Sequence, residues 1–391
     1  MKKGTMSGFA GGVAVSAVLV AGMLLTGNMS LNLSGDQSQV IQKIGILEKY
    51  IDAYYLEEVD ESQYADGIYK GLVDSLGDKY AEYYTEEEYQ ELMEATSGKY
   101  CGIGAQVMQN QESGVISIVL PFEGSPAAEA GLLPGDIVYK VAGEEVTGED
   151  LTAVVAKMKG EDGTTVEMQI YRDNEYIDVT VERREIEVPT VSHELLDKKI
   201  GYIAVSSFDE VTGKQFREAL EELENQGEKA LIIDLRNNGG GRLDVCVDML
   251  DRMLPEGTIV STKTKAGVGE TYTSTDKEAF DKPLVILINE NSASASEVFM
   301  GAIRDYGLGK LVGTKSFGKG IVQSIFDLKD GTAVKFTTSE YFSPKGNNIH
   351  GSGFEPDVKV ELDKELKTMI SIPKDKDNQL KKAIEVLEEM L

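Results

Sequence analysis

The sequence predicts a multidomain α/β protein with an N-terminal membrane anchor, a helical arm, a small β domain and an α/β core on a mixed or parallel sheet. At roughly 150 residues per domain, 391 residues are enough for two or three domains. Short strands punctuated by glycines fill residues 100–184, and apolar strands alternate with helices over residues 200–362. Such alternation is typical of a mostly parallel sheet covered by helices.

The N-terminal segment, residues 1–30, is predicted to cross a membrane. Lys2 and Lys3 precede an uncharged run over residues 8–27, which is long enough to span a bilayer. Cytoplasmic loops favour lysine and arginine, so everything after this run is expected outside the cytoplasm. Residues 26–30 match a signal-peptide cleavage site poorly, which favours a single-pass anchor in the cell membrane. Secretion after cleavage is the alternative.

Composition narrows the classes of partner. Apolar residues make up 41% and charged residues 27% of the chain, as in ordinary globular proteins. A net charge of -28 repels phosphate backbones, so we expect no nucleic-acid partner. Cys101 and Cys246 are too few for a disulfide framework, although one bridge between them remains open. With two histidines besides, we expect no metal and no cofactor.

Residues 36–98 are predicted to form a helical arm. Ile41, Ile44, Leu47 and Ile51 repeat at helical spacing, and a capping box at residues 85–88 marks the start of a further helix. This acidic segment is too short for a large core of its own, so it is either a solvated hairpin or an oligomerisation arm. Together with a short amphipathic helix in the final segment, residues 363–391, it makes a homodimer a reasonable expectation.

The β domain, residues 99–185, holds a candidate peptide site. A glycine loop over residues 100–105 leads into a strand, and such a loop can offer several backbone N–H groups to a carboxylate. Glycine matters here because a Cβ would block the approach. One convincing helix follows at residues 150–159, where apolar side chains share a face.

The run GSPAAEAGLLPGD, residues 124–136, resembles PDZ domains, notably those of proteases. That resemblance implies a groove between the strand after Gly104 and the helix over residues 151–158. The peptide-binding residues would then be Gly102, Ile103, Gly104, Ala105, Leu151 and Val154. The alternative from the residues alone is a small β domain with ordinary turns.

The third region, residues 186–362, contains a serine at a strand-to-helix junction. Ser294 follows a buried strand and begins a helix, where backbone N–H groups and the positive end of the helix dipole favour a nucleophile. The alternative is structural, because Ser294 and Glu297 also form a valid capping box.

A glycine-flanked lysine, Lys319, enters a later strand. A lysine acts as a base only when neutral, and burial lowers its pKa from about 10.4 towards that state. Ile321 and Gln323 are expected on the same strand face as Lys319, because strand side chains alternate with period two. The Gln323 amide oxygen would then orient the lysine amine without adding charge. A lone lysine is otherwise a solvated surface charge.

A glycine run at residues 239–241 follows another buried strand. Such a run can aim an amide at a developing oxyanion, but it fits a tight turn or a phosphate cradle equally well. It lacks the lysine and following Ser or Thr of a P-loop.

The glycine run, the serine segment and the lysine segment follow one another along the chain. Together they resemble the carboxyl-terminal-processing peptidases, or tail-specific proteases, over about residues 50–360. The matching motifs are DLRNNGGG, SASASE, FGKGIVQ and a closing GSGFEPD. The resemblance implies that Ser294 is the nucleophile, Lys319 the general base and Gln323 its support. The oxyanion hole would use the N–H of Ala295 and that of Gly240 or Gly241, and residues 186–362 would be the peptidase core.

The implied reaction is acyl transfer by a Ser/Lys dyad on extracytoplasmic proteins with free carboxyl termini. A Ser-His-Asp triad would have to recruit His193 or His350, neither of which lies near a motif in the sequence. A PDZ scaffold with an inactive protease half is one alternative function. A membrane-linked assembly protein without enzymatic activity is another.

Overall fold

The computed structural model describes residues 35–60, 62–275, 279–367, 369 and 372–391. It divides into two units, residues 1–67 and 68–391. In the first unit, α2 (Gly35–Tyr54) and the start of α3 (Ser62–Asp74) are helical as predicted. No helix in the described ranges combines the length and the apolar character needed to cross a bilayer. The predicted span, residues 8–27, lies outside the described residues.

The prediction of an entirely helical arm is wrong at residues 82–84. There, β1 (Glu82–Tyr84) pairs antiparallel with β18 (Ala333–Phe342) of the core. Tyr83 and Tyr84 are both buried, which fits the preference of aromatic residues for strands. The predicted capping box is confirmed, because Thr85 and Glu88 exchange hydrogen bonds at the start of α4 (Glu86–Ser97).

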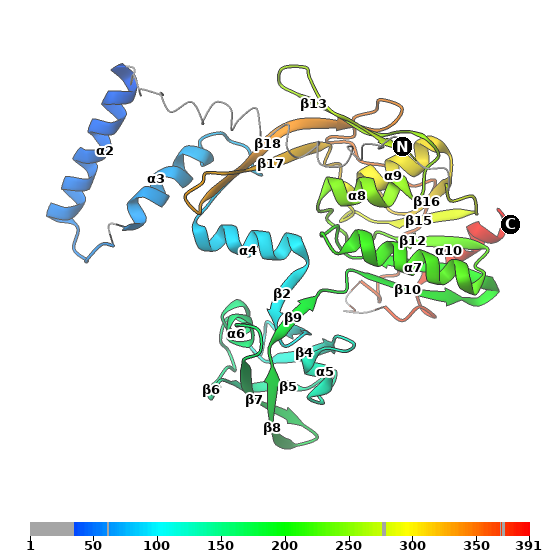
Figure 1. The fold of residues 1–391 in the computed structure, drawn as a ribbon, viewed down its shortest axis with the longest axis horizontal. Coiled ribbons are helices and arrows are strands. Elements are labelled where there is room, and N and C mark those ends of the chain that lie inside the picture. The colour runs from blue at the N-terminus through cyan, green and yellow to red at the C-terminus, as the bar shows by residue number, and fades with distance from the viewer. Residues whose placement is uncertain (1–34, 61, 276–278, 368, 370–371) are drawn as a thin grey trace, which may run out of the picture. The chain divides into compact units, whose positions relative to one another are not determined.

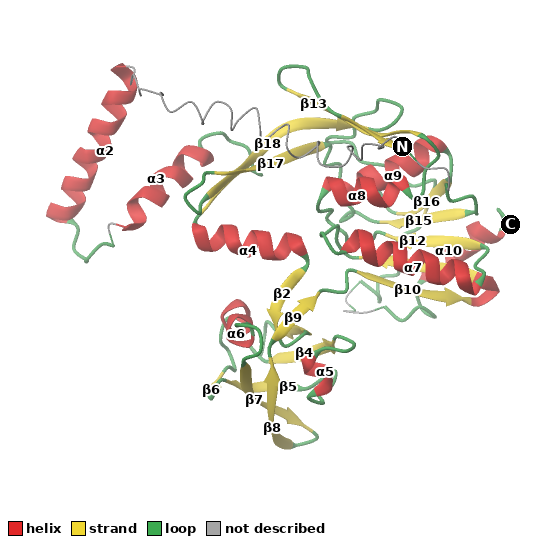
Figure 2. Ribbon diagram, viewed as in Figure 1, coloured by secondary structure: helices red, strands yellow, loops and turns green. Residues whose placement is uncertain are grey.

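The β domain begins and ends on one two-stranded ribbon, in which β2 (Lys99–Gly102) pairs antiparallel with β9 (Arg184–Glu187). Figure 2 shows the sheet that follows. Its strands and helices are β3 (Ala105–Gln109), β4 (Ile116–Pro121), α5 (Pro126–Glu129), β5 (Ile137–Val141), β6 (Glu144–Glu145), α6 (Leu151–Met158), β7 (Thr165–Arg172) and β8 (Glu175–Glu182). Among the described strands, β3 pairs with β4 alone, so its other edge has no partner strand there.

A six-stranded sheet forms the centre of the third region, the α/β core. In order it holds β10 (Val191–Leu196), β11 (Ile200–Val205), β12 (Ala230–Asp234), β15 (Leu284–Ile288), β16 (Gly309–Gly313) and β19 (Val358–Lys359). The first pair is antiparallel and all others are parallel, which confirms the predicted mixed sheet. A short 3-10 turn, Asp197–Lys199, joins the antiparallel pair.

Helices cover both faces of this sheet (Figure 1). Alternate strand residues such as Ile233 and Ile286 pack in one apolar cluster with α7 (Thr212–Gln226), α8 (Leu243–Asp251) and α9 (Ala295–Tyr306). Their neighbours Ile232 and Val285 pack in a second cluster with α10 (Asn378–Glu388). The predicted C-terminal helix therefore closes the opposite face of the sheet.

A second sheet of the core is antiparallel and was not predicted from the sequence. It joins β1, β18, β13 (Gly257–Thr264) and β14 (Thr271–Ser274), and β17 (Ile321–Asp327) pairs with β18. Most residues of β17 and β18 are only partly buried, so the sequence has no continuous apolar run that would indicate these strands. This sheet positions the loop that carries Lys319.

Candidate active site

Ser294 lies between β15 and α9 in a strained backbone conformation. Its φ is 56° and its ψ is −117°, a combination that a residue with a Cβ rarely adopts. The Ser294 N–H donates to the carboxylate of Glu297 at 3.1 Å. The N–H of Ala295, the first residue of α9, forms no hydrogen bond with any residue that the structure describes. The serine thus stands at a helix N-terminus beside an uncommitted amide.

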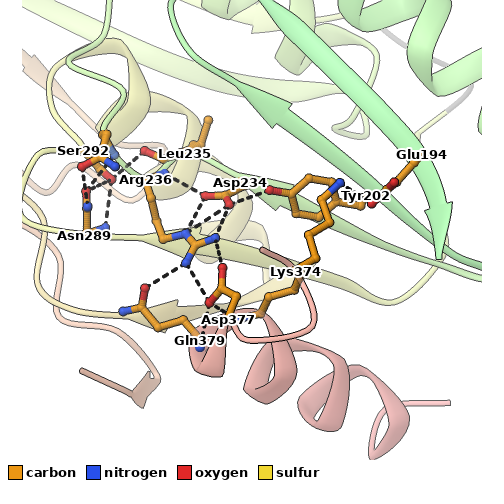
Figure 3. A network of polar contacts seen from close by, with 12 residues as sticks. Glu194, Tyr202, Asp234, Leu235, Arg236, Asn289, Ser292, Lys374, Asp377 and Gln379 are labelled. Carbon is orange, nitrogen blue, oxygen red and sulfur yellow. Dashed lines mark hydrogen bonds and ion pairs between the residues drawn. The ribbon is translucent and has the colours of Figure 1, made fainter. Parts of the chain in front are cut away.

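The two neighbouring serines have different partners. The Ser292 hydroxyl donates to the Leu235 carbonyl at 2.7 Å and accepts the Asn289 N–H at 3.0 Å (Figure 3). The Ser296 hydroxyl donates to the Asn238 carbonyl at 2.9 Å. Both side chains are fully buried, so their contacts tie the serine segment to the strand and loop of β12.

Asn238 connects the glycine run to the serine segment. Its side-chain oxygen accepts the Gly240 N–H at 2.8 Å, and its amide nitrogen donates to the Val205 carbonyl at 2.8 Å. Its own carbonyl accepts the Ala293 N–H at 3.0 Å. Asn238 is completely buried, and this set of bonds fixes the run against the residues just before Ser294.

The two candidate oxyanion glycines differ in their hydrogen bonds. A Cβ on Gly240 would lie 2.8 Å from the Cβ of Ser294 and 2.9 Å from the nitrogen of Ala295, and φ there is +104°. Only glycine fits this approach. The Gly240 N–H is already bonded to Asn238, whereas the Gly241 N–H has no partner in the described part of the chain. These contacts favour Gly241 as the second donor.

A buried ionic network holds the start of this loop to the C-terminal helix (Figure 3). The Arg236 guanidinium donates to Asp234, to Asp377 at 2.8 Å and to Gln379 at 3.0 Å, and Tyr202 donates to Asp234 at 2.8 Å. Burial alone would lower the pKa of Arg236, but the two carboxylates outweigh it and raise that pKa. Asp377, which also caps α10, lies 141 positions from Arg236, so the sequence offers no local signal for this pair.

Lys319 lies in the loop before β17 and faces an open cavity of about 480 Å³. Its ammonium nitrogen is 4.3 Å from the centroid of the Tyr80 ring, a cation–π contact. Gln323 lines the same cavity, but its amide donates to the Thr337 hydroxyl at 3.1 Å. The other lining residues are Asp74, Lys79, Ala81, Glu82 and Lys335. Among the described residues, no hydrogen bond joins the Lys319 amine to Ser294 or Gln323.

The expected strand face of Lys319, Ile321 and Gln323 is interrupted. Lys319 precedes the strand, and the pairing of β17 with β18 shifts register between Val322 and Gln323. Such a bulge breaks the simple alternation of side chains. Lys319 and Gln323 nevertheless line one cavity, although the lining does not include Ile321.

The surroundings of Lys319 lower its pKa. Burial is the main cause, and the positive charges of Lys335 and Lys79 act in the same direction, whereas Asp78 opposes them. A lower pKa increases the neutral fraction that a general base requires. The sequence analysis missed Asp78, Lys79 and Tyr80, because they lie in the arm far from the lysine motif in the chain.

Among the described residues, neither histidine forms a Ser-His-Asp triad with Ser294. The His193 ring nitrogen pairs with the Glu222 carboxylate at 2.9 Å on the surface. The loop of His350 does approach the lysine loop, contrary to expectation, since the Gly351 N–H donates to the Gly318 carbonyl at 2.9 Å. The His350 side chain is exposed and hydrogen-bonds to none of the described residues.

The candidate peptide-binding residues belong to the β domain, at the start of β3 and on α6. Ile103 and Val154 are buried in the apolar core of the β domain, and Leu151 packs partly against it. The Gly104 backbone has φ +77°, and a Cβ there would lie 2.5 Å from that of Ser125, so this position requires glycine.

A tyrosine already occupies the glycine loop. The Tyr100 ring packs against Gly102, where an added Cβ would be 2.8 Å from the ring. Burial raises the pKa of Tyr100, while the backbone amides of Gly104 and Ala105, close to its hydroxyl, oppose that rise. The same two amides are candidates for binding a peptide carboxylate.

The two cysteines are free thiols. Cys101 is partly exposed in the β domain, whereas Cys246 is buried in α8 and donates to the Ala295 carbonyl at 3.2 Å. Burial raises the pKa of Cys246, so this thiol stays protonated.

Comparison with known proteins gives consistent results along the chain. Residues 199–360 match Peptidase family S41, and residues 118–172 match a PDZ domain. A probable CtpA-like serine protease of Staphylococcus aureus (strain COL) is 35% identical over 359 residues, which cover 90% of this chain and 72% of the relative. A protein of the same description from Staphylococcus haemolyticus (strain JCSC1435) is 35% identical over 367 residues, 93% of this chain and 73% of the relative.

Among solved structures, a putative S41 protease from Bacteroides fragilis shares the fold. Its TM-score is 0.56 at 17% identity, over 86% of this chain and 93% of that one. The sequence matches, the PDZ domain and the arrangement of strands and helices agree with one another. The chain therefore belongs to peptidase family S41 and is a serine protease.

Proposed function

We propose that this protein is a C-terminal-processing endopeptidase that uses a Ser/Lys dyad, with Ser294 as nucleophile and Lys319 as general base. The observation that carries the proposal is the setting of Ser294. Its strained backbone stands at a helix N-terminus and the glycine run approaches it at Gly240. The amides of Ala295 and Gly241 have no partner among the described residues. The lowered pKa of Lys319 supplies a base without imidazole.

The reaction is acyl transfer. Neutral Lys319 takes the proton of the Ser294 hydroxyl as the oxygen attacks the peptide carbonyl, and the two amides bind the oxyanion. The resulting lysine ammonium then gives its proton to the leaving amine, and the substrate's acyl group remains on Ser294. Lys319 next removes a proton from water, which hydrolyses the ester and restores the hydroxyl.

The lysine amine has to move before it can act. It lies over the Tyr80 ring, and among the described residues no hydrogen bond joins it to Ser294. Catalytic hydrogen bonds are often made only in the substrate complex. Rotation of the flexible lysine side chain within the open cavity would bring the amine to the serine. Gln323, which lines the same cavity, would orient it there.

The PDZ domain would capture the substrate tail. An extended peptide would add to the open edge of β3, and its carboxylate would bind the amides around Gly102, Ile103, Gly104 and Ala105. Leu151 on α6 would contact its apolar end, whereas Val154 is fully buried in the core of the domain. The substrates would be exported or membrane proteins with free, loose carboxyl termini.

Membrane anchoring and dimer formation are part of the same proposal. Residues 8–27 would hold the protease at the cell membrane, with the catalytic part outside the cytoplasm. α2 exposes apolar side chains, among them Ile41, Leu47 and Ile51, and we propose that a second copy covers them. Light scattering of the chain with and without residues 35–60 would test the dimer.

The decisive experiment compares wild-type protein with Ser294→Ala on a peptide with a free carboxyl terminus. The variant should lose turnover by several powers of ten and still bind the peptide, because binding belongs to the PDZ domain. Mass spectrometry of the products would show cleavage near the tail. Cleavage by Ser294→Ala at the wild-type rate would disprove the assignment of the nucleophile, whereas inactive wild-type protein that binds tails would favour a PDZ scaffold.

A further inference from the structure

The backbone N–H groups of both proposed catalytic residues converge on one carboxylate oxygen. Glu297 Oε2 accepts the Ser294 N–H at 3.1 Å and the Lys319 N–H at 2.7 Å. The other oxygen, Oε1, accepts the Ser316 hydroxyl at 2.6 Å and the Gly318 N–H at 2.7 Å. Glu297 is 1% exposed, so these four donors satisfy its carboxylate oxygens in place of water.

Three of these bonds have no role in capping the helix. A capping box needs only the contact between Glu297 and Ser294. The bonds to Ser316, Gly318 and Lys319 reach 19 to 22 positions along the chain, into the loop of the proposed base. The carboxylate thus joins the start of α9 to a loop of the antiparallel sheet.

The backbone carbonyl groups of the same two residues converge on one hydroxyl. Tyr341 Oη lies 2.6 Å from the Lys319 carbonyl oxygen and 3.2 Å from that of Ser294. A hydroxyl has one proton, so the shorter bond dominates and the longer contact shares it. Tyr341 is 3% exposed in β18, and burial raises its pKa, which keeps the hydroxyl protonated as a donor.

We propose that Glu297 and Tyr341 are positioning residues that hold the backbones of Ser294 and Lys319 at a fixed separation, one through the N–H groups and the other through the carbonyl groups. This inference rests on the proposed dyad. It explains how a strained serine in one sheet layer and a lysine loop in another keep one relative position. The lysine side chain can then rotate towards the serine while its backbone stays in place.

Removal of either clamp should damage catalysis more than binding. A displacement of about 1 Å at a catalytic group can cost on the order of 100-fold in rate. Tyr341→Phe removes only the hydroxyl and should lower kcat about 10- to 100-fold with little change in KM. Glu297→Gln points an N–H₂ group at N–H donors and should have the larger effect. Glu297→Asp keeps the charge and should recover part of the loss.

The matched controls lie away from the dyad. Tyr306 also donates to a backbone carbonyl, that of Thr258 at 3.0 Å, and lies at the far end of α9. Glu228 is likewise a buried acid, paired with Lys282. Tyr306→Phe and Glu228→Gln should keep the wild-type kcat. Kinetics on a tail peptide and the rate of Ser294 labelling by a fluorophosphonate would be measured for all five variants, with thermal unfolding as the check on folding.

A double-mutant comparison separates positioning from general damage. In a Lys319→Ala background, Tyr341→Phe should lower the residual rate barely further, because the group it positions is gone. A wild-type kcat for Tyr341→Phe, or an additive double mutant, would overturn the clamp and leave the dyad intact. Wild-type turnover by Ser294→Ala would instead overturn the proposed function. If Tyr341→Phe fails to fold, Glu297→Gln tests the same clamp, since a wild-type kcat for that variant excludes it.

Discussion

The proposed nucleophile and the proposed base of this protease are held in different ways. On the serine side, Ser294 and the glycine run are fixed by buried bonds through Asn238 and through the Arg236 network. On the lysine side, the backbone of Lys319 is bonded, but its amine lies over an aromatic ring beside an open cavity. The serine is preorganised, whereas the position of the lysine amine remains adjustable.

The difference assigns separate tasks to the two sheets of the core. The mixed sheet holds the proposed oxyanion site, and preorganised donors of this kind are usually the largest source of electrostatic stabilisation in catalysis. The antiparallel sheet carries the proposed base, a charged group that on this proposal has to become neutral and to move.

The largest expected effect is on the lysine side. Lys319→Arg keeps the positive charge but should abolish turnover, because guanidinium does not lose its proton at accessible pH. Peptide binding should survive. Steady-state assays with a tail peptide would measure this. Near-normal turnover would mean that the lysine is only a structural cation.

The second effect concerns stability on the serine side. Arg236→Met leaves Asp234 and Asp377 buried without their common partner and should destabilise the fold by about 3 kcal/mol. Urea unfolding would measure it. Arg304→Met is the control, because Arg304 is partly exposed, its ion pair with Asp357 is long, and its loss should cost less than about 1 kcal/mol. Equal destabilisation by both variants would contradict a special role for the network.

The third effect is a shift in the pH profile. Activity should rise with pH as Lys319 loses its proton, through a pKa that lies below its usual value. Lys79→Met removes a neighbouring positive charge, so the pKa of Lys319 and the midpoint should move up. Asp78→Asn removes the charge that stabilises the ammonium, so the midpoint should move down. Measurement of kcat/KM as a function of pH for both variants would test the directions of the two shifts. Shifts of the midpoint in the same direction would contradict this electrostatic account.

The smallest effect separates capture of the tail from alignment of the base. Amidation of a peptide's carboxyl terminus should raise KM, because the loop amides lose an anionic partner. If the PDZ domain only tethers substrate, kcat stays unchanged; if tail binding aligns the adjustable lysine, kcat falls too. Equal cleavage of amidated and free-acid peptides at all concentrations would remove the PDZ domain from the mechanism.

Local patterns in the sequence predicted most of the serine side. The alternation of apolar strands with helices over residues 200–362 predicted helices of the kind seen in α7, α8 and α9, and the glycine run that ends at Gly241 follows its strand as expected. The mixed sheet followed from the alternation of strands and helices. These features depend on neighbours in the chain, which a single sequence displays.

Long-range contacts were the part that could not be predicted. β1 pairs with a strand some 250 positions later, and no apolar alternation in β18 announces it. Tyr80, Tyr341 and Asp377 reach the site through tertiary packing, so their sequence context is that of ordinary residues. Glu297 was interpreted as a cap because its nearest partner is local, while its bonds to the lysine loop are not.

The ribbon of β2 and β9 has a consequence for evolution. Lys99 pairs with Glu187 and Gly102 with Arg184, so the first and last residues of the intervening domain lie next to each other. A segment attached in this way can be exchanged without new ends in the surrounding fold, since its termini already lie side by side. Residues 103–183 could therefore be replaced as a unit while the surrounding fold is kept.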